Sequence, residues 1–305
     1  MSFITSWIGE TWHLLAESSV YVLFGLLIGG MLRVFLSPGT VARHLGTGRV
    51  MSVLKASLLG IPMPLCSCGV LPAGASLKRQ GANNGATTAF LISTPETGVD
   101  SLAITYALLG PVMTVARPIA AFATATVAGL AENFLGRKLG DAEITADLSC
   151  PIDGCCDGED CPEDEHRHHH SFGQKLKAGL GFAFGELWAG IAGWFMVGMV
   201  LAGLIGALVP EEFFAEYLGG GMQSMLLMLA VGIPIYICAS GSTPIAAMLI
   251  LKGVSPGAAL VFLMAGPATN VTSLSVLMGV LGKRATAIYL VSIAVMSVAA
   301  GLALD

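Results

Sequence analysis

Long apolar runs, separated by short polar stretches, dominate this chain. The runs long enough to cross a bilayer, roughly 20 residues each, cover residues 18–36, 50–77, 84–109, 111–135, 182–209, 222–251, 256–281 and 285–304. The pattern therefore predicts an all-α polytopic membrane protein.

Prolines interrupt several of these runs. They are Pro62, Pro64 and Pro72 in the second run, Pro95 in the third, Pro234 and Pro244 in the sixth and Pro267 in the seventh. Proline removes a helix hydrogen bond and clashes with the preceding turn. We therefore expect broken helices or re-entrant hairpins, and eight to ten membrane segments in all.

The chain aligns with itself without a gap when residues from Ile61 onward are matched with those from Ile233 onward. Helix-breaking and small residues match: Pro62, Cys66, Gly69, Pro72, Gly81, Gly85 and Pro95 align with Pro234, Cys238, Gly241, Pro244, Gly253, Gly257 and Pro267. Upstream, with a one-residue slip, Gly25 and Gly30 match Gly198 and Gly203. We predict two homologous repeats of about four to five segments each. Such repeats with broken helices are typical of secondary transporters.

The repeat divides the chain into three parts. Residues 1–135 form the first membrane repeat, whose N-terminal segment carries Trp7 and Trp12 and is predicted to lie at the membrane interface. Residues 136–178 form an acidic linker rich in Cys and His, too poor in large apolar residues to fold alone. Residues 179–305 form the second repeat.

Composition agrees with a membrane protein. Hydrophobic residues make up 54% of the chain and charged residues 11%, against about 25% charged in soluble domains. Ten of the 20 acids lie in the linker, so the net charge of −5 does not describe an acidic surface. Nothing indicates nucleic-acid binding. No phosphate-binding loop occurs, so transport is expected to use an ion gradient or a separate partner chain.

The basic residues pose a conflict about orientation. Arg33, Arg43, Arg49 and Lys55 favour a cytoplasmic first connection, and Arg137, Lys138, Lys175 and Lys177 favour a cytoplasmic linker. With four full spans per half, both cannot lie inside. Either one segment is re-entrant or the charge rule fails. We favour a cytoplasmic linker, where its thiols stay reduced.

The segment 64–72 carries Cys66, Ser67 and Cys68. On a regular helix residues i and i+2 point about 200° apart, so the two thiols face one cavity only if the segment is unwound. The repeat places Cys238 opposite Cys66 and Ser240 opposite Cys68. Three thiols around one centre would bind Cu(I), Zn(II) or trivalent arsenic. The alternative is that these cysteines are small buried hydrophobic residues.

Glu96 lies in the middle of an apolar run, where an acid costs roughly 2.5–3.5 kcal/mol. Because burial disfavours the charged form, Glu96 is a candidate to exchange a proton for a cation. Its counterpart in the second repeat is Ala268, close to Asn270, which we include among the candidate substrate-binding residues. Arg117 is a conceivable partner of Glu96. The alternative is a solvated acid at a re-entrant tip.

The linker is the second candidate metal site. Its thiols and imidazoles are Cys150, Cys155, Cys156, Cys161, His166, His168, His169 and His170. Cys and His are the usual ligands of zinc and copper, but this spacing matches no standard zinc finger. The linker is therefore predicted to be a flexible arm that captures or delivers metal, and the alternative is a solvated acidic linker.

The segments 64–72 and 93–98 resemble the predicted permease family that includes the organoarsenical efflux permeases. The Cys/His-rich linker is similar to the branch described as copper/zinc efflux transporters. This resemblance implies a bacterial inner-membrane exporter of soft metal species. It also implies that a membrane cysteine binds the substrate, and Cys66 and Cys68 occupy the matching positions. The metal-rich linker departs from the plain arsenical pattern.

We therefore expect a permease, not an enzyme, that exports Cu(I) or Zn(II) through a thiol-lined site between the repeats. It is expected to be driven by a gradient and to carry no prosthetic group. One alternative is efflux of an organoarsenical. Another is a membrane thiol oxidoreductase using Cys66 and Cys68, although the usual redox spacing is Cys-x-x-Cys. A metal sensor is the remaining alternative.

Overall fold

The computed structural model describes residues 3–35, 41–63, 65–136, 172–208, 221–233, 239–251 and 253–305. Every regular element within these ranges is a helix, which confirms the all-α prediction. Cys238 and the metal-binding candidates of the linker lie outside the described residues, so the hypotheses about them stay predictions.

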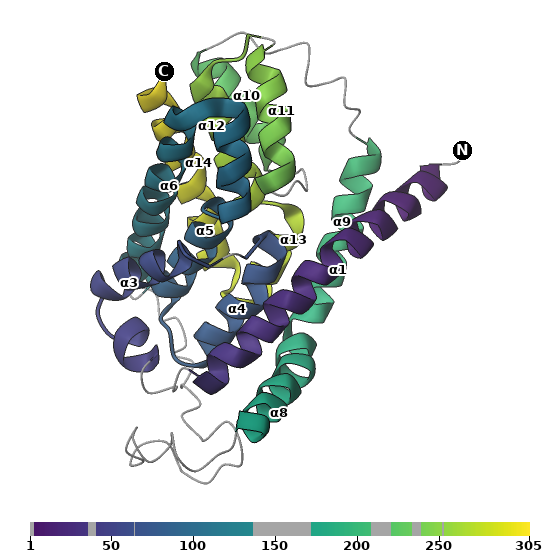
Figure 1. The fold of residues 1–305 in the computed structure, drawn as a ribbon, viewed down its shortest axis with the longest axis vertical. Helices are drawn as coiled ribbons and strands as arrows, with labels where there is room; N and C mark the ends of the chain where they lie inside the picture. Colours follow the sequence, from purple (N-terminus) through teal and green to yellow (C-terminus); the bar gives the residue numbers. More distant parts are fainter. Residues whose placement is uncertain are drawn as a thin grey trace.

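The helices are short in the middle of each half and long at its ends (Figure 1). In chain order they are α1 (Phe3–Phe35), the π-helical turn η1 (Ala42–Gly46), α3 (Met51–Gly60), α4 (Ser67–Arg79), α5 (Asn84–Glu96), α6 (Val99–Gly136), α8 (Phe172–Phe182), the π-helical turn η3 (Ala183–Leu187), α9 (Trp188–Leu208), α10 (Met222–Gly232), α11 (Ala239–Leu251), α12 (Pro256–Ala268), α13 (Val271–Val280) and α14 (Lys283–Leu304).

Two stretches of the described helices are long and apolar enough to cross a membrane, Ser101–Leu135 and Lys283–Leu304, and two bent pairs bring the number to at most four. This is fewer than the eight to ten membrane segments expected, because several apolar runs consist of two short helices with a break between them. Pro62 lies in the break after α3. By contrast, Pro72 and Pro244 were wrongly expected to interrupt the chain, since α4 and α11 continue through them.

Helix α3 runs into the protein and α4 returns to the same side. The starts of α3 and α5 lie together, because Asn83 Nδ2 donates to Ser52 Oγ at 2.9 Å. Their ends also lie together, because Thr97 Oγ1 donates to the Ile61 carbonyl at 3.3 Å. Helices α3 and α5 are therefore parallel, and α4 leads back between them. The ten residues of α3 rise about 15 Å, half of a hydrocarbon core of about 30 Å.

Helix α6 folds back on itself at Gly110, which has a φ of +81°. Arg117 Nη1 donates to Ser101 Oγ at 2.9 Å, a contact that a straight helix forbids at this spacing. The part of α6 after the reversal runs back beside α5, where Asn133 Oδ1 accepts from the Gly85 amide at 3.1 Å. Helix α5 and the first part of α6 thus run in one direction, and the remainder of α6 returns beside them.

The second half contains helices with matching bounds. Helices α11 and α12 begin and end 172 residues after α4 and α5, at 239 and 251 against 67 and 79, and at 256 and 268 against 84 and 96. The connecting glycines Gly81 and Gly253 both have a φ of +97°. Asp305 Oδ1 accepts from the Gly257 amide at 2.6 Å, in the same way as Asn133 accepts from Gly85.

Helices α1 and α8–α9 are the long helices at the start of each half, and they pack antiparallel (Figure 1). Gly30 lies against Gly179, and Trp7 Nε1 donates to the Val200 carbonyl at 3.1 Å. The packing of the long helices differs between the halves, because α1 packs against α4 whereas α9 packs against α13.

The contacts define two ends of the molecule. At the first, here called the linker face, Asn133 Nδ2 donates to the Arg49 carbonyl at 3.0 Å, close to Asn83. At the other, the opposite face, one apolar crevice is lined by Leu108, Leu109, Val112 and Met113 together with Leu251, Pro256 and Leu304. Helix α14 therefore runs from the linker face to the opposite face.

We expect the close helix contacts in each half to be sensitive to a single methyl group. A Cβ at Gly85 would collide with the Gly129 carbonyl, and a Cβ at Gly257 would collide with the Gly301 carbonyl. Gly85→Ala and Gly257→Ala should therefore each destabilise the protein by about 1–3 kcal/mol. Thermal unfolding in detergent measures this effect.

Gly181 in α8 is the matched control, since nothing lies within 4 Å of its position for a Cβ. Gly181→Ala should leave stability unchanged or raise it by up to about 1 kcal/mol, because alanine is the better helix former. A Gly85→Ala protein as stable as the parent would contradict the packing described here.

Candidate functional site

The thiols of Cys66 and Cys68 meet where α4 begins. Cys66 precedes the helix with extended backbone angles (φ −73°, ψ 172°), and its Sγ accepts from the Gly69 amide at 3.4 Å. Cys68 lies in the first turn, and a side-chain hydrogen bond joins the two thiols. Cys66 is partly buried and Cys68 is buried. The break after α3 thus brings together two sulfurs that a continuous helix would point apart.

Ser67, between the two cysteines, lines a narrow crevice at the centre of the protein. Four broken helices contribute to its walls: Ser67 and Val70 come from α4, Leu91 and Pro95 from α5, Pro267 and Ala268 from α12, and Ser273 and Leu277 from α13, with Tyr289 from α14. The crevice is too narrow to admit water. The centre is therefore closed in this conformation, and passage of any solute requires the walls to separate.

Glu96 is the last residue of α5 and is only 2% exposed. It follows Pro95, so it stands beside the crevice. Neither of its carboxyl oxygens accepts a hydrogen bond from the described residues. Arg117 is its electrostatic partner. The acid is therefore buried within the electrostatic reach of a cation, and it is not a solvated residue at an exposed tip.

Arg117 lies on the returning part of α6 and is 2% exposed. Its Nη1 donates to Ser101 Oγ and Thr105 Oγ1 on the first part of α6, and at 3.5 Å to Thr243 Oγ1 on α11. These hydroxyls hold the guanidinium group in place across both halves of the chain. They are neutral, so they satisfy hydrogen bonds without cancelling its charge.

Tyr289 on α14 is the residue 172 positions after Arg117, and it is buried in the same centre. Its hydroxyl donates to the Ala268 carbonyl at 2.7 Å. One half thus carries the pair Glu96 and Arg117, and the other carries Ala268 and Tyr289. Sequence reasoning missed Tyr289, although applying the offset of 172 to Arg117 would have found it.

The other predicted site residues have different positions. Asn270 caps α13, where its Oδ1 accepts from the Ser273 amide at 2.7 Å. Ser240 belongs to α11, but its side chain lies outside the described residues, as does Cys238. Among the described residues, no group of three or more Cys, His, Asp or Glu side chains gathers to hold a metal ion.

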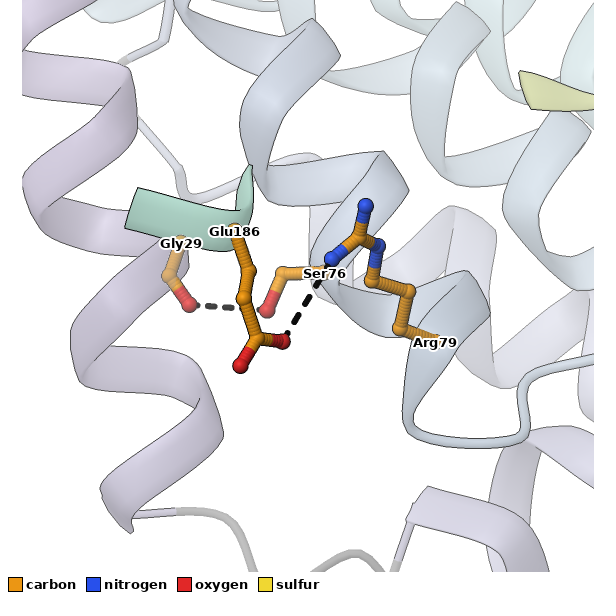
Figure 2. A network of polar contacts seen from close by, with 4 residues as sticks. All are labelled: Gly29, Ser76, Arg79 and Glu186. Atoms are coloured by element: carbon orange, nitrogen blue, oxygen red, sulfur yellow. Dashed lines mark hydrogen bonds and ion pairs between the residues drawn. The ribbon is translucent and has the colours of Figure 1, made fainter. Parts of the chain in front are cut away.

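Polar contacts tie the outer end of α4 to neighbouring helices (Figure 2). Ser76 Oγ donates to the Gly29 carbonyl of α1 at 2.8 Å, and Arg79 Nη1 lies 3.7 Å from Glu186 Oε2 of η3. The helix that begins with the thiols is therefore anchored at its other end, close to the helices that follow the linker.

Comparison with known proteins points to one family. The profile of the family ArsP_1, described as "Predicted permease", matches residues 10–305. "Putative permease Rv2963" of Mycobacterium tuberculosis is 27% identical over 74% of this chain, which spans 58% of that protein's length. "UPF0718 protein YcgR" of Bacillus subtilis is 23% identical over 95% of this chain and 93% of its own.

A Streptococcus mutans relative is named "Putative two-component membrane permease complex subunit" and is 22% identical over 86% of this chain and 82% of its own. No solved structure matches this chain.

We expect Asn270 to contribute through its helix cap. Asn270→Ala removes the acceptor for the Ser273 amide and should lower stability by about 1 kcal/mol. Asn270→Ser keeps an acceptor and should restore most of that loss. Thermal unfolding in detergent checks both variants, and equal losses in the two would show that the cap is not what Asn270 supplies.

Proposed function

The chain belongs to the predicted permease family, and from this premise we propose that it is a multi-pass permease of a bacterial inner membrane that exports a soft metal ion. The ion passes through a thiol-lined site between two homologous repeats. No ATP-binding motif occurs on this chain, so the driving force is an ion gradient or a partner chain.

Two inverted repeats account for the fold. Helices α4 and α5 share their length and their offset of 172 with α11 and α12, and α1 packs antiparallel to its counterpart α8–α9. In each half, a re-entrant pair (α3–α4 or α10–α11) enters and leaves from one face. That leaves an odd number of crossings per half, which inverts the second repeat. Inverted repeats with broken helices bind their substrate near the midplane, where the repeats meet.

The pairing of the Cys66 and Cys68 thiols is the observation that carries the proposal. Both lie at the start of a half-helix, beside a crevice to which both halves contribute. Irregular backbone is tolerated at this depth only where it lines a protein-enclosed site. Thiolate ligands select Cu(I) and Zn(II) over hard cations. Cys238 aligns with Cys66 and is the proposed third ligand.

Glu96 and the linker complete the proposed pathway. The carboxyl group of Glu96 takes up a proton when the metal leaves, which couples export to a proton gradient. The four cysteines and four histidines of the linker collect metal before it enters the membrane site. Because thiols lose protons when they bind a metal, binding weakens as the pH falls.

The distribution of basic residues supports a cytoplasmic linker face. Arg43, Arg49, Lys55, Lys78, Arg79, Lys177, Lys283 and Arg284 all belong to the half of the molecule at this face. Cytoplasmic segments carry the excess of Lys and Arg. If α3–α4 is re-entrant, the first connection and the end of α6 that leads into the linker share one side, where Asn133 donates to the Arg49 carbonyl, and the basic residues of both then agree with the charge rule.

Loss of either membrane thiol should strongly reduce metal export. In proteoliposomes loaded with a metal indicator, Cys66→Ser and Cys68→Ser should each lower Cu(I) and Zn(II) flux by about tenfold or more. Met196→Leu is the matched control, since it removes a sulfur from an exposed surface position and should keep the parent's rate. Flux of both metals at the parent's rate in both cysteine variants would refute the thiol site.

The same assay separates the proposal from organoarsenical efflux. A parent protein that moves a trivalent monoalkyl arsenical but neither metal would assign the site to arsenicals.

Labelling of intact cells checks the orientation. A membrane-impermeant maleimide should not react with the linker cysteines. It should react with Met222→Cys, because the end of α10 at Gly232 lies against Gly266 near the end of α12, which leaves Met222 at the end that points toward the opposite face. The reverse pattern would place the linker face outside.

A further inference from the structure

Helices α3 and α5 carry a row of buried hydroxyl groups between them. Ser52 and Ser57 lie on α3, and Thr87, Ser93 and Thr94 lie on α5. All five side chains are 0% exposed. Burying a hydroxyl group lowers stability unless the group finds a hydrogen-bond partner. A row of them inside an apolar protein therefore needs a reason.

The second half shows that the helix frame does not require these hydroxyls. At an offset of 172, the residues that match Ser57, Thr87, Ser93 and Thr94 are apolar, namely Leu229, Ala259, Ala265 and Gly266. Helix α12, the counterpart of α5, carries no hydroxyl side chain between its bounds, and α10 carries Ser224 alone. The row thus belongs to the half that also carries Glu96.

The outer part of the row begins at the linker face. There Asn83 Nδ2 donates to Ser52 Oγ at 2.9 Å. Thr87 lies one turn deeper on the same face of α5, where its Oγ1 donates to the Asn83 carbonyl at 3.1 Å. Ser57 lies five residues after Ser52 on the parallel helix α3. Both hydroxyls are therefore about 6 to 8 Å deeper than the outer contact.

The inner part of the row ends beside Glu96. Gly60 is three residues after Ser57, and a Cβ at Gly60 would collide with Ser93 Oγ and Thr94 Oγ1. Ser93 lies three residues before Glu96 on α5, so the two side chains are neighbours on the helix surface. The row therefore extends from the linker face to the buried acid.

Ser57 stands between the outer and the inner parts. Its Oγ is buried and has no hydrogen-bond partner among the described residues. Ordered water is the usual partner of such a group. One or two water molecules on either side of Ser57 are enough to connect it with Thr87 and with Ser93, because each gap is only about 5 to 8 Å along the helices.

We propose that this hydroxyl row is a proton path between Glu96 and the linker face. When the metal ion enters, the carboxyl group of Glu96 gives its proton to the row. Each hydroxyl or water accepts one proton and passes on its own, and one proton reaches the water at the linker face. The carboxylate stays behind, so charges and protons balance. The inference rests on the proton exchange at Glu96 in the proposed function and gives that proton its route.

The charged and titratable groups that act on Glu96 lie on other helices. They are Arg117 on α6 and Tyr289 on α14, and the thiols of Cys66 and Cys68 begin α4 at the same crevice. Substitutions in the hydroxyl row leave all of these groups in place.

Hydrogen–deuterium exchange of the Glu96 carboxylic acid tests the path without any metal. Infrared spectroscopy of the purified full chain, at a pH low enough to protonate the acid, follows its C=O band, which Glu96→Gln assigns by removing it. Ser57→Leu introduces the residue that α10 carries at the matching position, and Thr87→Val removes a hydroxyl at nearly constant volume. Each should slow exchange by about tenfold or more, because positioned acid–base groups accelerate proton transfer at least that much.

Thr88→Val is the matched control. Thr88 is also 0% exposed on α5, but it lies three residues before Leu91, which packs against Gly74 of α4, and so it points away from the row. This variant should exchange at the parent's rate. A purely structural defect has the opposite effect to loss of the path, because local opening of the helices admits D2O and speeds exchange.

Exchange in Thr87→Val at the parent's rate or faster would overturn the proton path, as would equal slowing in Thr88→Val. Failure of the proposed function gives a different result. A parent that moves neither Cu(I) nor Zn(II) in proteoliposomes, while Thr87→Val still slows exchange, loses its metal cargo and keeps its path. If Glu96→Gln removes no carboxylic acid band at any pH, proton uptake at Glu96 and the path fall together.

Discussion

A hydrocarbon environment offers no water to the amide and carbonyl groups of a broken helix, so every break must be enclosed by protein. This constraint organises the molecule. The described residues of α5 from Gly85 to Glu96 and of α12 from Gly257 to Ala268 are all buried. Longer helices surround them and present apolar side chains outward, such as Val112 on α6 and Val291 on α14. The backbone groups exposed at the helix breaks are tolerated because the shorter helices that contain them lie inside the protein.

Enclosing the breaks also concentrates polarity at one place. The starts of α4 and α13 and the ends of α5 and α12 meet around the central crevice, and helix ends carry partial charges and unsatisfied backbone groups. Cys66 and Asn270 cap two of these ends. The two halves then differ in chemistry, with the acid Glu96 and the cation Arg117 in one and a neutral hydrogen bond between Tyr289 and Ala268 in the other.

Much of this architecture was predictable from local pattern. The break after α3 coincides with Pro62, and α5 and α12 end one residue after Pro95 and Pro267. Proline was a poorer guide in α4 and α11, which continue through Pro72 and Pro244. Each of these prolines lies one turn inside its helix, where it costs one backbone hydrogen bond and crowds the preceding turn, and in α4 the packing of α1 covers Pro72. Apolar length alone did not reveal that residues 50–77 turn back, because a re-entrant pair and a full crossing have similar composition.

The amino-acid sequence by itself determined the membrane class, the internal correspondence at an offset of 172 and the thiols and acid worth testing. These follow from composition, helix-breaking residues and spacing, which are local properties of the chain. Only the tertiary structure decided that Arg117 lies close enough to Glu96 to act on it electrostatically and that Tyr289 reaches the Ala268 carbonyl. Those outcomes depend on the reversal at Gly110 and on contacts such as Arg117 to Thr243, 126 residues apart. No local pattern records them, because helix packing alone brings such distant residues together.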